Sequence, residues 1–523
     1  MPLSIDHAEN LVRDAASEAS AGEPAAKLPE WDLSDLYPAI DSSILAADLA
    51  AAEQGAAQFA AEFRGRLGEL ARDAAASEKL GEAVRRYEAL QDLLGRIMSY
   101  AGLVYSGDTS DPVRAKFFGD IQGKITDAST QLLFFQLELN RLDDKLLDAV
   151  AAVAPLSHWR PWLEDIRKEK PYELDDKLEE LFHEKSITGK SAWNRLFDET
   201  IAALRFSVGD KELTLEPVFN LMQDQREEVR REAAEAIGVT LKKHLRTFAL
   251  ITNTLAKDKE ISDRWRGFED VADARHLSNR VEREVVGALV ASVEAAHPRL
   301  SHRYYKLKAK WFGKEALDYW DRGAPLPAVP AQSYSFDDAR DIVLRAYSGF
   351  SPRMAEIAGR FFERRWIDAP VRPGKAPGAF AHPTVPSAHP YVLVNFQGKT
   401  RDVMTLAHEL GHGVHQVLAA TQGALMAPTP LTLAETASVF GEMLTFRALL
   451  AGTTDKDKKR RAARLEGRGH DQHRRAADRL LFLRTQGAYR EEERRADGRA
   501  AVRIMDERAA REPRAAHSPR RRL

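Results

Sequence analysis

The 523-residue chain contains no cysteine, which excludes disulfide bonds and thiolate metal sites. It has no run of about 18 apolar residues, so no membrane-spanning helix is expected. Its first residues, MPLSIDHAENLVRD, include early acidic groups and no apolar stretch, which argues against a secretion signal. We therefore expect a cytoplasmic protein that does not insert into membranes.

Lysine is absent from the last part of the chain, although the net charge of the whole is only −2. Residues 460–523 contain 19 Arg, no Lys and 10 acidic residues, a net charge of +9, which leaves −11 for the other 459 residues. Such a split can mark a tail that binds nucleic acid or a membrane. The tail has little aromatic content between its arginines, which argues against that reading.

Helix-forming residues with apolar side chains at helical spacing dominate residues 40–150 and 196–320. Proline and glycine gather in residues 323–333 and 369–390 and forbid regular helix there. The stretch YVLVNF (391–396) follows and predicts one short strand. No repeat of fixed period is present. The fold class is therefore mainly α, with a small β element just before the stretch described next.

The stretch TLAHELGHGVHQ (405–416) places His408 and His412 one helical turn apart. Both imidazoles can therefore reach one ion, while Glu409 is placed to accept a proton from water rather than to bind the ion. Thr400 or Asp402 is expected to cap this helix, which covers roughly 403–419. The side chains expected to form its buried stripe are Val403, Leu406, Ala407, Leu410, Val414 and Val417.

Two imidazoles leave a tetrahedral zinc site one protein ligand short. The next predicted helix, TLAETASVFGEML (432–444), offers Glu435 and Glu442 on one face. We favour Glu435 as the ligand and Glu442 as an acceptor that orients His408 or His412. Alternatively, Glu442 binds the ion, or Thr432 and Glu435 form an N-terminal capping box.

His415 lies one turn beyond His412, which places it along the cleft rather than on the same ion. A third histidine six residues after His412 would indicate a different class of protease, but position 418 is Leu.

The segments HPYVLVNFQGKTRDVMTLAHELGHGVHQ (389–416) and LAETASVFGEML (433–444) resemble the oligoendopeptidase F family, zinc peptidases related to thimet oligopeptidase. WDLSDLYP (31–38) and SYAGLVYSGDTSDP (99–112) resemble the N-terminal half of that family. The resemblance covers about residues 28–466.

The resemblance implies a large helical peptidase with a deep substrate channel and one zinc ion (Zn2+) at the channel floor. It implies cleavage of short peptides rather than folded proteins. Carried onto this sequence, it makes His408, His412 and Glu435 the zinc ligands and Glu409 the general base. The strand YVLVNF would be the edge along which the substrate backbone lies.

The sequence departs from the family after residue 465. The family carries a Tyr- and His-rich stretch there that should supply donors to the oxyanion. This chain has nothing like it, and Tyr489 is its only tyrosine after residue 465. His382, His389 and Tyr391 are the nearby groups that could substitute.

Suitable codons for RGHDQHRRAADRLL (468–481), read one base later, give EDMINTVVRQIAF, a helical sequence of the kind that family members carry. We therefore hypothesise a frameshift near residue 466. Sequencing the gene across the codons for residues 460–480 decides it, because an unshifted frame with no homologous alternative would defeat the idea.

The expected organisation has three parts: an N-terminal helical region (1–205), a catalytic region (206–466) and an out-of-frame, disordered Arg-rich tail (467–523). The leading hypothesis is a zinc metalloendopeptidase of short peptides with impaired activity, and with no nucleic-acid or membrane partner. The alternatives are a zinc-binding helical protein without significant peptidase activity, and a helical scaffold that binds no zinc. The sequence does not indicate an oligomeric state.

Overall fold

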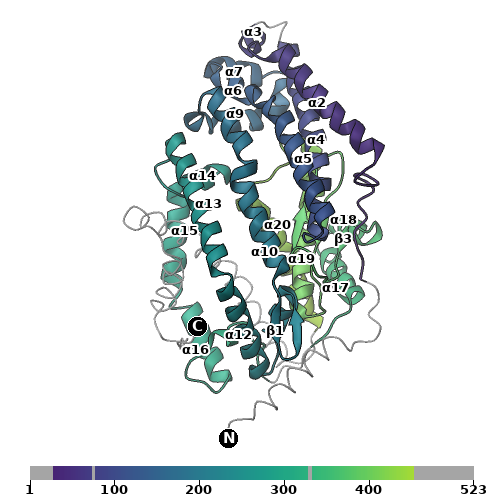
Figure 1. The fold of residues 1–523 in the computed structure, drawn as a ribbon, viewed down its shortest axis with the longest axis vertical. Coiled ribbons are helices and arrows are strands. Elements are labelled where there is room, and N and C mark those ends of the chain that lie inside the picture. The colour runs from purple at the N-terminus through teal and green to yellow at the C-terminus, as the bar shows by residue number, and fades with distance from the viewer. Residues whose placement is uncertain (1–27, 73–76, 328–331, 453–523) are drawn as a thin grey trace.

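The computed structural model describes residues 28–72, 77–327 and 332–452, and Figure 1 shows an elongated molecule built mainly of helices. The predicted out-of-frame tail (467–523) lies outside the described residues. No helix in these described ranges combines the length and the apolar character needed to cross a lipid bilayer. The prediction of a mainly α protein is confirmed.

The first helices build the upper part of the molecule in Figure 1 and reach down its centre. The long helix α4 contains the amphipathic segment 84–105 and packs against α2 and α5. The helices of this group are α2 (Ser43–Phe63), α3 (Leu67–Arg72), α4 (Ser77–Gly107), α5 (Pro112–Thr130), α6 (Leu133–Arg141), α7 (Asp144–Ala151), α8 (Arg160–Arg167), α9 (Asp176–Lys185) and α10 (Ala192–Ala203).

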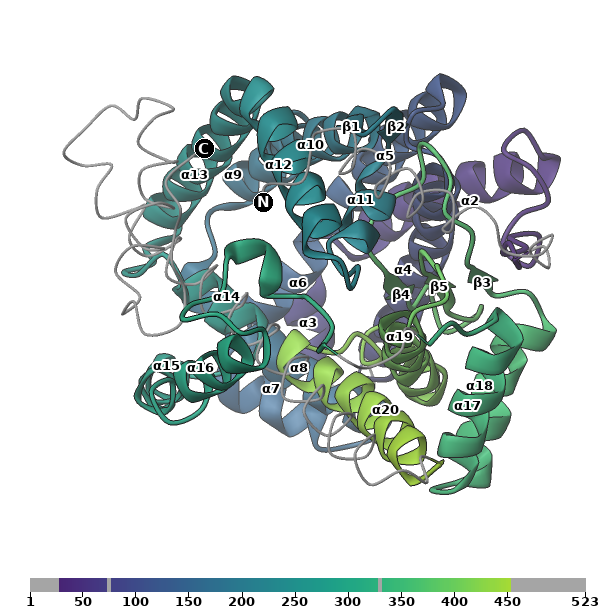
Figure 2. The same cartoon turned by 90° about the horizontal axis from the view of Figure 1, so that it is seen from below.

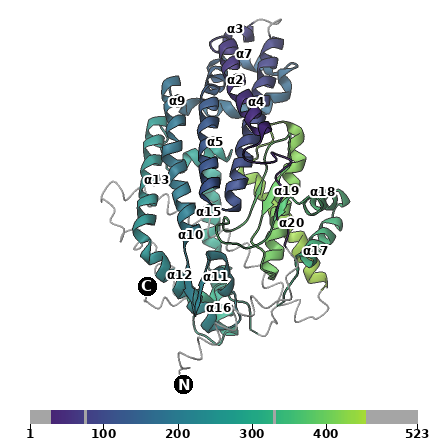
Figure 3. The ribbon, with the colours of Figure 1, turned by 45° about the vertical axis from the view of Figure 1, so that its right-hand side comes forward.

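A second group of helices runs along the left side and the lower end of the molecule in Figure 1. These are α11 (Leu215–Leu221), α12 (Glu227–Lys243), α13 (Leu245–Arg266), α14 (Asp273–Ser278), α15 (Arg283–Ala296) and α16 (Ser301–Trp311). The last group is α17 (Phe336–Ser348), α18 (Pro352–Glu363), α19 (Thr400–Ala419) and α20 (Leu431–Gly452). In Figures 2 and 3, α17 and α18 lie together beside α19 and α20.

Two small sheets interrupt the helices. The strands β1 (Phe206–Val208) and β2 (Lys211–Leu213) form an antiparallel hairpin. The second sheet has the order β3-β5-β4, in which β3 (Ile367–Asp368) is parallel and β4 (Phe380–His382) antiparallel to β5 (Tyr391–Leu393).

The prediction that YVLVNF contains a strand is confirmed by β5, but its expected role as a substrate edge is wrong. β5 is the central strand of its sheet, so both of its edges are already paired. The outer strand that packs against α19 is β4. It arises within the Pro- and Gly-rich segment 369–390, where the composition excluded helix but gave no periodic signal for a strand.

The main hydrophobic core joins the N-terminal helices to the C-terminal ones. It includes buried side chains of α2, α4 and α6 together with those of α17, α18, β5 and α19. The segment 31–38 packs on the same sheet, since Asp32 N–H donates to Arg365 O at 2.8 Å and Tyr391 Oη donates to Asp32 O at 2.8 Å. This core therefore crosses the predicted 205/206 division, which remains a prediction.

Candidate metal centre

The helix that carries the predicted metal motif, α19, is anchored by the apolar stripe that the sequence predicts. Val403, Leu406, Ala407 and Leu410 are fully buried, Val414 is 5% exposed, and Val417 packs at the margin of the core. This burial fixes one side of α19, so the opposite side presents His408 and His412.

The helix begins at Thr400 and has Lys399 as its N-cap, so neither residue expected to cap it does so. Asp402 is instead the third helical residue. Its carboxylate accepts hydrogen bonds from the backbone N–H groups of Lys399 and Gln397, both at 2.9 Å. A carboxylate there also suits the positive end of the helix dipole, so Asp402 still stabilises the helix start.

His408, His412 and Glu435 converge, with one potential ligand atom from each lying within 4.8 Å of the others. His408 Nε2 is 3.3 Å from Glu435 Oε2, and His412 Nε2 is 3.6 Å from Glu435 Oε1. Zinc bonds of 2.0–2.2 Å in a tetrahedron separate two ligand atoms by about 3.4 Å. The residues therefore fit a zinc ion in both donor type and spacing.

Two glycines let α19 and α20 approach closely enough for this convergence. A Cβ added to Gly411 would lie 2.7 Å from Ala437 O and 2.8 Å from Ser438 Cα, both backbone atoms of α20. A Cβ added to Gly441 would lie 3.0 Å from Ala407 O on α19. Figure 2 shows the two helices side by side. Only glycine at these positions permits contact between the two backbones.

Tyr347 of α17 closes the same crossing. Its hydroxyl donates to Ala407 O at 2.5 Å, and the side chain is fully buried. Burial raises the pKa of Tyr347, so the phenol stays a neutral donor. Because Ala407 directly precedes His408, this bond ties the start of the metal motif to a third helix.

Glu435 faces the histidines rather than capping its own helix. α20 begins at Leu431, and the Thr432 hydroxyl donates to Asn279 O at 2.8 Å. Glu442, two turns further along α20, has Oε2 3.4 Å from His408 Nδ1. This is the position expected for an acceptor that fixes the ring of a metal-binding histidine.

The carboxylates around His408 dominate its electrostatics. Burial disfavours the imidazolium, but the hydrogen bonds to Glu435 and Glu442 outweigh it and raise the pKa of His408 to about 10. Hydrogen bonds from His408 and His412 hold the pKa of Glu435 well below its usual range. The metal-free cluster therefore carries positive charge on an imidazole, and metal binding must release a proton from His408.

Glu409 is buried, with 7% of its surface exposed, and burial raises its pKa. The charges of His408 and His412 and a hydrogen bond from the Ala381 backbone N–H oppose this rise. Ala381 belongs to β4, and its carbonyl accepts from Gln416 Nε2 at 3.1 Å. A raised pKa brings a carboxylate closer to the working range of a general base at neutral pH.

The other histidines and the tyrosine expected near the site lie outside the metal cluster. His415 is on α19, and burial lowers its pKa. His389 stacks on Trp366 at 3.7 Å between ring centroids and pairs with Asp35 at 2.9 Å. Tyr391 donates to the backbone of the N-terminal segment. Their roles in a cleft remain predictions.

His382, also considered as a donor, has Nε2 2.9 Å from Ser99 Oγ, and burial lowers its pKa to about 4. It is therefore neutral near pH 7 and engaged with α4.

A second acidic group, Glu227, Asp318 and Asp321, also has atoms close enough to bind a metal. Its centre is taken by Lys314, whose Nζ lies 2.6 Å from Glu227, 3.2 Å from Asp318 and 2.6 Å from Asp321. The ammonium group supplies the positive charge that an ion would bring. We therefore assign this group a structural role.

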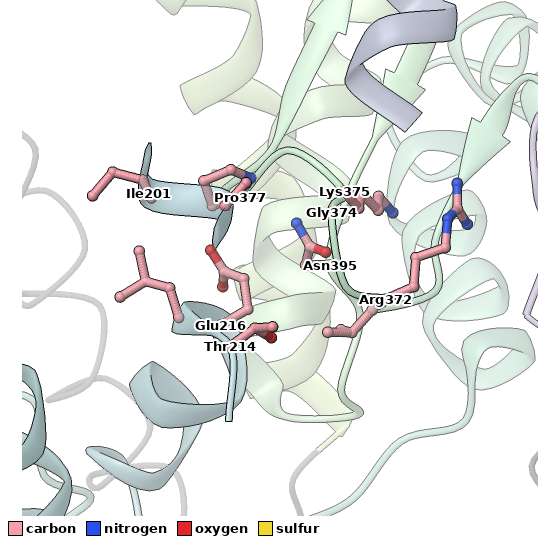
Figure 4. Close-up of a pocket in the computed structure, with 11 residues that line it drawn as sticks. Ile201, Thr214, Glu216, Arg372, Gly374, Lys375, Pro377 and Asn395 are labelled. Atoms are coloured by element: carbon pink, nitrogen blue, oxygen red, sulfur yellow. The ribbon is translucent and has the colours of Figure 1, made fainter. Parts of the chain in front are cut away.

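Two cavities of the described chain lie away from the metal cluster. One has a volume of about 20 Å³, enough for one water molecule, and Figure 4 shows Glu216, Arg372, Lys375 and Asn395 around it. Lys375 does not serve this cavity as a free charge, since its Nζ contacts Asp368 at 2.6 Å and three backbone carbonyls. The other, about 580 Å³, is an open groove between α17 and α18. Neither is lined by His408, His412 or Glu435, and the channel implied by the resemblance remains a prediction.

Five residues with a place in the site were not predicted from the sequence: Gly411, Gly441, Ser438, Tyr347 and Ala381. Gly411 and Ser438 sit inside the two motifs, one residue before His412 and three after Glu435, so their spacing was visible. Their function depends on how two helices cross, which no local pattern records. No sequence signal could have identified Ala381, because it contacts Glu409 and Gln416 through its backbone N–H and C=O rather than through its side chain.

Two family models match the chain. The model described as Peptidase family M3 matches residues 220–478, which include the metal cluster, and the model described as Oligopeptidase F matches residues 138–206. The two matches leave few residues between them and together cover most of the described chain.

Several bacterial proteins are similar to this chain over most of its length. Oligopeptidase PepF of Bacillus subtilis is 25% identical over 410 residues, which are 76% of this chain and 59% of that protein. Group B oligopeptidase PepB of Streptococcus agalactiae is 26% identical over 375 residues, 70% of this chain and 62% of that protein. The chain thus spans about six-tenths of the length of these curated relatives.

Solved structures share the fold. PZ peptidase A superposes with a TM-score of 0.63 at 17% identity, covering 84% of this chain and 73% of its own. Oligoendopeptidase F from Enterococcus faecium superposes with a TM-score of 0.59 at 16% identity, covering 89% of this chain and 76% of its own. At such identities the likeness establishes the architecture alone.

Proposed function

Because this chain belongs to peptidase family M3, within the oligoendopeptidase F group, we propose that it is a zinc-dependent metalloendopeptidase of short peptides. The observation that carries the proposal is the convergence of His408, His412 and Glu435 at zinc-ligand spacing, with Glu409 beside them. One zinc ion held there would polarise the scissile carbonyl and acidify a water molecule.

Glu409 performs the proton transfers in the proposed reaction. Its buried carboxylate, with a pKa raised by burial, accepts a proton from the attacking water and later donates it to the leaving amine. Ala381 N–H holds the carboxylate in place. Glu442 accepts from His408 Nδ1, so the proton released on metal binding would come from Nε2, whose lone pair would then be directed toward the ligand cluster.

The outer strand β4 takes the substrate-guiding role first expected of β5. Its residue Ala381 has a backbone N–H that contacts the catalytic base and a C=O that contacts Gln416, so this strand borders the metal helix directly. A peptide aligned along β4 would meet Glu409 through main-chain contacts that tolerate many sequences. Short, extended peptides are therefore the proposed substrates. The proposed location of the reaction is the cytoplasm.

A second function is favoured by the state of the possible oxyanion donors. His382 is paired with Ser99, His389 with Asp35 and Tyr391 with the Asp32 carbonyl. Without another donor, the reaction loses a contribution that is typically worth a hundredfold or more in rate. The alternative is thus a zinc-binding helical protein without significant peptidase activity.

The test compares the parent protein with Glu409→Gln. Both are loaded with one equivalent of zinc and given a quenched fluorescent peptide of about ten residues. We expect slow cleavage by the parent and a loss of 10²–10⁴-fold in kcat for the variant, because only the base is removed. Zinc affinity, measured by competition with a chromophoric chelator, should be unchanged within a few fold.

The outcomes separate the candidate functions. Zinc uptake without cleavage by the parent would support the inactive zinc-binding protein. Equal cleavage by parent and Glu409→Gln would refute the proposed base. No stoichiometric uptake of zinc would refute both functions and leave only a helical scaffold.

A further inference from the structure

Ser438 of α20 lies beneath the proposed ligand Glu435. The serine is fully buried, and its hydroxyl lies 2.8 Å from Glu435 Oε2 and 3.1 Å from Glu435 O. One hydroxyl proton can serve only one acceptor well, and the carboxylate is the closer and the more strongly accepting of the two. The shorter bond therefore joins Ser438 to the metal-binding side chain.

Glu435 needs such a restraint more than the two histidines do. Its side chain is 53% exposed, whereas those of His408 and His412 are 16% and 14% exposed. A half-exposed glutamate loses rotamer freedom when it is held in one geometry, and this loss opposes metal binding. A hydrogen bond already present before metal binding reduces the freedom that remains to be lost.

Ser438 is itself fixed relative to α19. Its Cα would lie 2.8 Å from a Cβ on Gly411, so the serine sits at the closest approach of the two helices. Gly411 is adjacent to His412 in the chain. The hydroxyl thus connects the ligand on α20 to the stretch of α19 that carries both imidazoles.

We propose that Ser438 is a positioning residue that holds the Glu435 carboxylate toward His408 and His412 and thereby sets the affinity of the site for zinc. The inference rests on the proposed function for the identity of the ion. It goes beyond that function by assigning a role to a hydroxyl that contacts no substrate and carries no charge.

A purely local role for the hydroxyl gives a different expectation. Serine and threonine inside helices commonly donate to a carbonyl three or four residues earlier. Thr445, also fully buried on α20, does this with Gly441 O at 3.0 Å. If Ser438 only bonds its own helix, removing either hydroxyl should affect helix stability alone.

The experiment therefore compares Ser438→Ala with Thr445→Val in the full-length chain. Zinc dissociation constants are measured by chelator competition, and the visible spectrum of the Co2+-loaded protein reports the ligand geometry. We expect Ser438→Ala to weaken zinc binding by 10- to 100-fold and to alter the Co2+ spectrum, as for other groups that orient metal ligands. Thr445→Val should match the parent in both.

A double-mutant cycle with Glu435→Ala tests whether Ser438 affects zinc affinity through the Glu435 carboxylate. In that background, Ser438→Ala should cause no further loss of zinc affinity, whereas independent structural damage would add to it. If Ser438→Ala does not fold, Ser438→Gly removes the same hydroxyl without added volume and gives the same readout.

Parent-like zinc affinity and Co2+ spectrum in a folded Ser438 variant would overturn the positioning role. So would a loss that adds fully to that of Glu435→Ala. Failure of the parent to bind zinc would instead contradict the proposed function, so the two failures are distinguishable.

Discussion

Gly411 is the residue on which the spacing of the proposed metal ligands depends most directly. A methyl group there would meet backbone atoms of Ala437 and Ser438 at 2.7 and 2.8 Å, and backbone cannot move aside as a flexible side chain can. We expect Gly411→Ala to push α20 away from α19. The cost should be about 1–3 kcal/mol of unfolding free energy from overpacking, together with weaker zinc binding.

Urea denaturation and chelator competition measure the two effects. Gly287→Ala is the matched control, because that helical glycine has nothing within 4 Å of an added Cβ. It should gain up to about 1 kcal/mol from helix propensity. If Gly411→Ala has the same unfolding free energy and zinc affinity as Gly287→Ala, the close contact between α19 and α20 at Gly411 is refuted.

His382 predicts a pH dependence of stability. Burial lowers its folded pKa to about 4, below the ordinary value near 6.5. Between these values the unfolded chain binds more protons, so stability is retained above pH 6.5 and is lost as the pH falls toward 4. The loss from this residue between pH 7 and pH 5 should be on the order of 1–2 kcal/mol.

Urea unfolding at both pH values, compared with His382→Gln, isolates the contribution of this histidine from those of other titrating groups. The variant should lose less stability than the parent over this interval. Equal losses in the two proteins would contradict the buried, neutral imidazole.

At the scale of elements, Glu88 of α4 anchors the connection between α19 and α20, the two helices that carry the proposed metal ligands. Its carboxylate accepts from Trp159 Nε1 at 3.1 Å and from Leu425 N at 3.2 Å. We expect Glu88→Ala to cost about 1–3 kcal/mol, because a buried indole N–H and a loop N–H lose their partner. Limited proteolysis should show faster cleavage within residues 420–430.

The exposed Glu82 on the same helix provides the control. Glu82→Ala should leave both the unfolding midpoint and the cleavage rate near those of the parent. Unchanged proteolysis of Glu88→Ala would indicate that the connection is held by other contacts.

The helices were more predictable than the strands and the helix starts. The stripe Val403 to Val414 predicted which face of α19 is buried, because the apolar side chains repeat at the helical period. The cap of α19 could not be predicted, since Asp402 reaches backward from inside the helix rather than preceding it. The order β3-β5-β4 depends on long-range pairing that short segments do not encode.

The site likewise contains some residues that a local sequence pattern predicts and others whose roles depend on long-range contacts. His408, Glu409 and His412 follow from one local motif, and Glu435 from the next predicted helix. Gly411 and Ser438 acquire their roles only when two helices cross, and Ala381 acts through backbone groups.

At the scale of the whole molecule, we expect that residues 206–523 do not fold alone, because the main core contains side chains from both sides of the predicted 205/206 division. The β4–β5 region depends on α4 through His382 to Ser99 at 2.9 Å, and the buried face of α19 shares its core with N-terminal helices. A chain of residues 206–523 should therefore expose a large apolar surface and aggregate or remain unfolded.

Expression of residues 206–523 with and without a co-expressed chain of residues 1–205 tests this. We expect soluble, zinc-binding protein only when both are present. A fragment that unfolds cooperatively and binds zinc by itself would instead support an independent catalytic domain at the predicted 205/206 division. This experiment does not test the proposed frameshift near residue 466. Only sequencing the gene can decide that hypothesis.

The outer strand β4 has one more consequence, for behaviour in a crowded solution. An unpaired strand edge is a template on which other copies of a chain can stack. Here the strand is three residues long, and the backbone N–H and C=O of its middle residue are bonded to Glu409 and Gln416. Glu409 and Gln416 of α19 therefore also cap this edge against pairing with another chain, and only a peptide that replaces both contacts can use the edge in full.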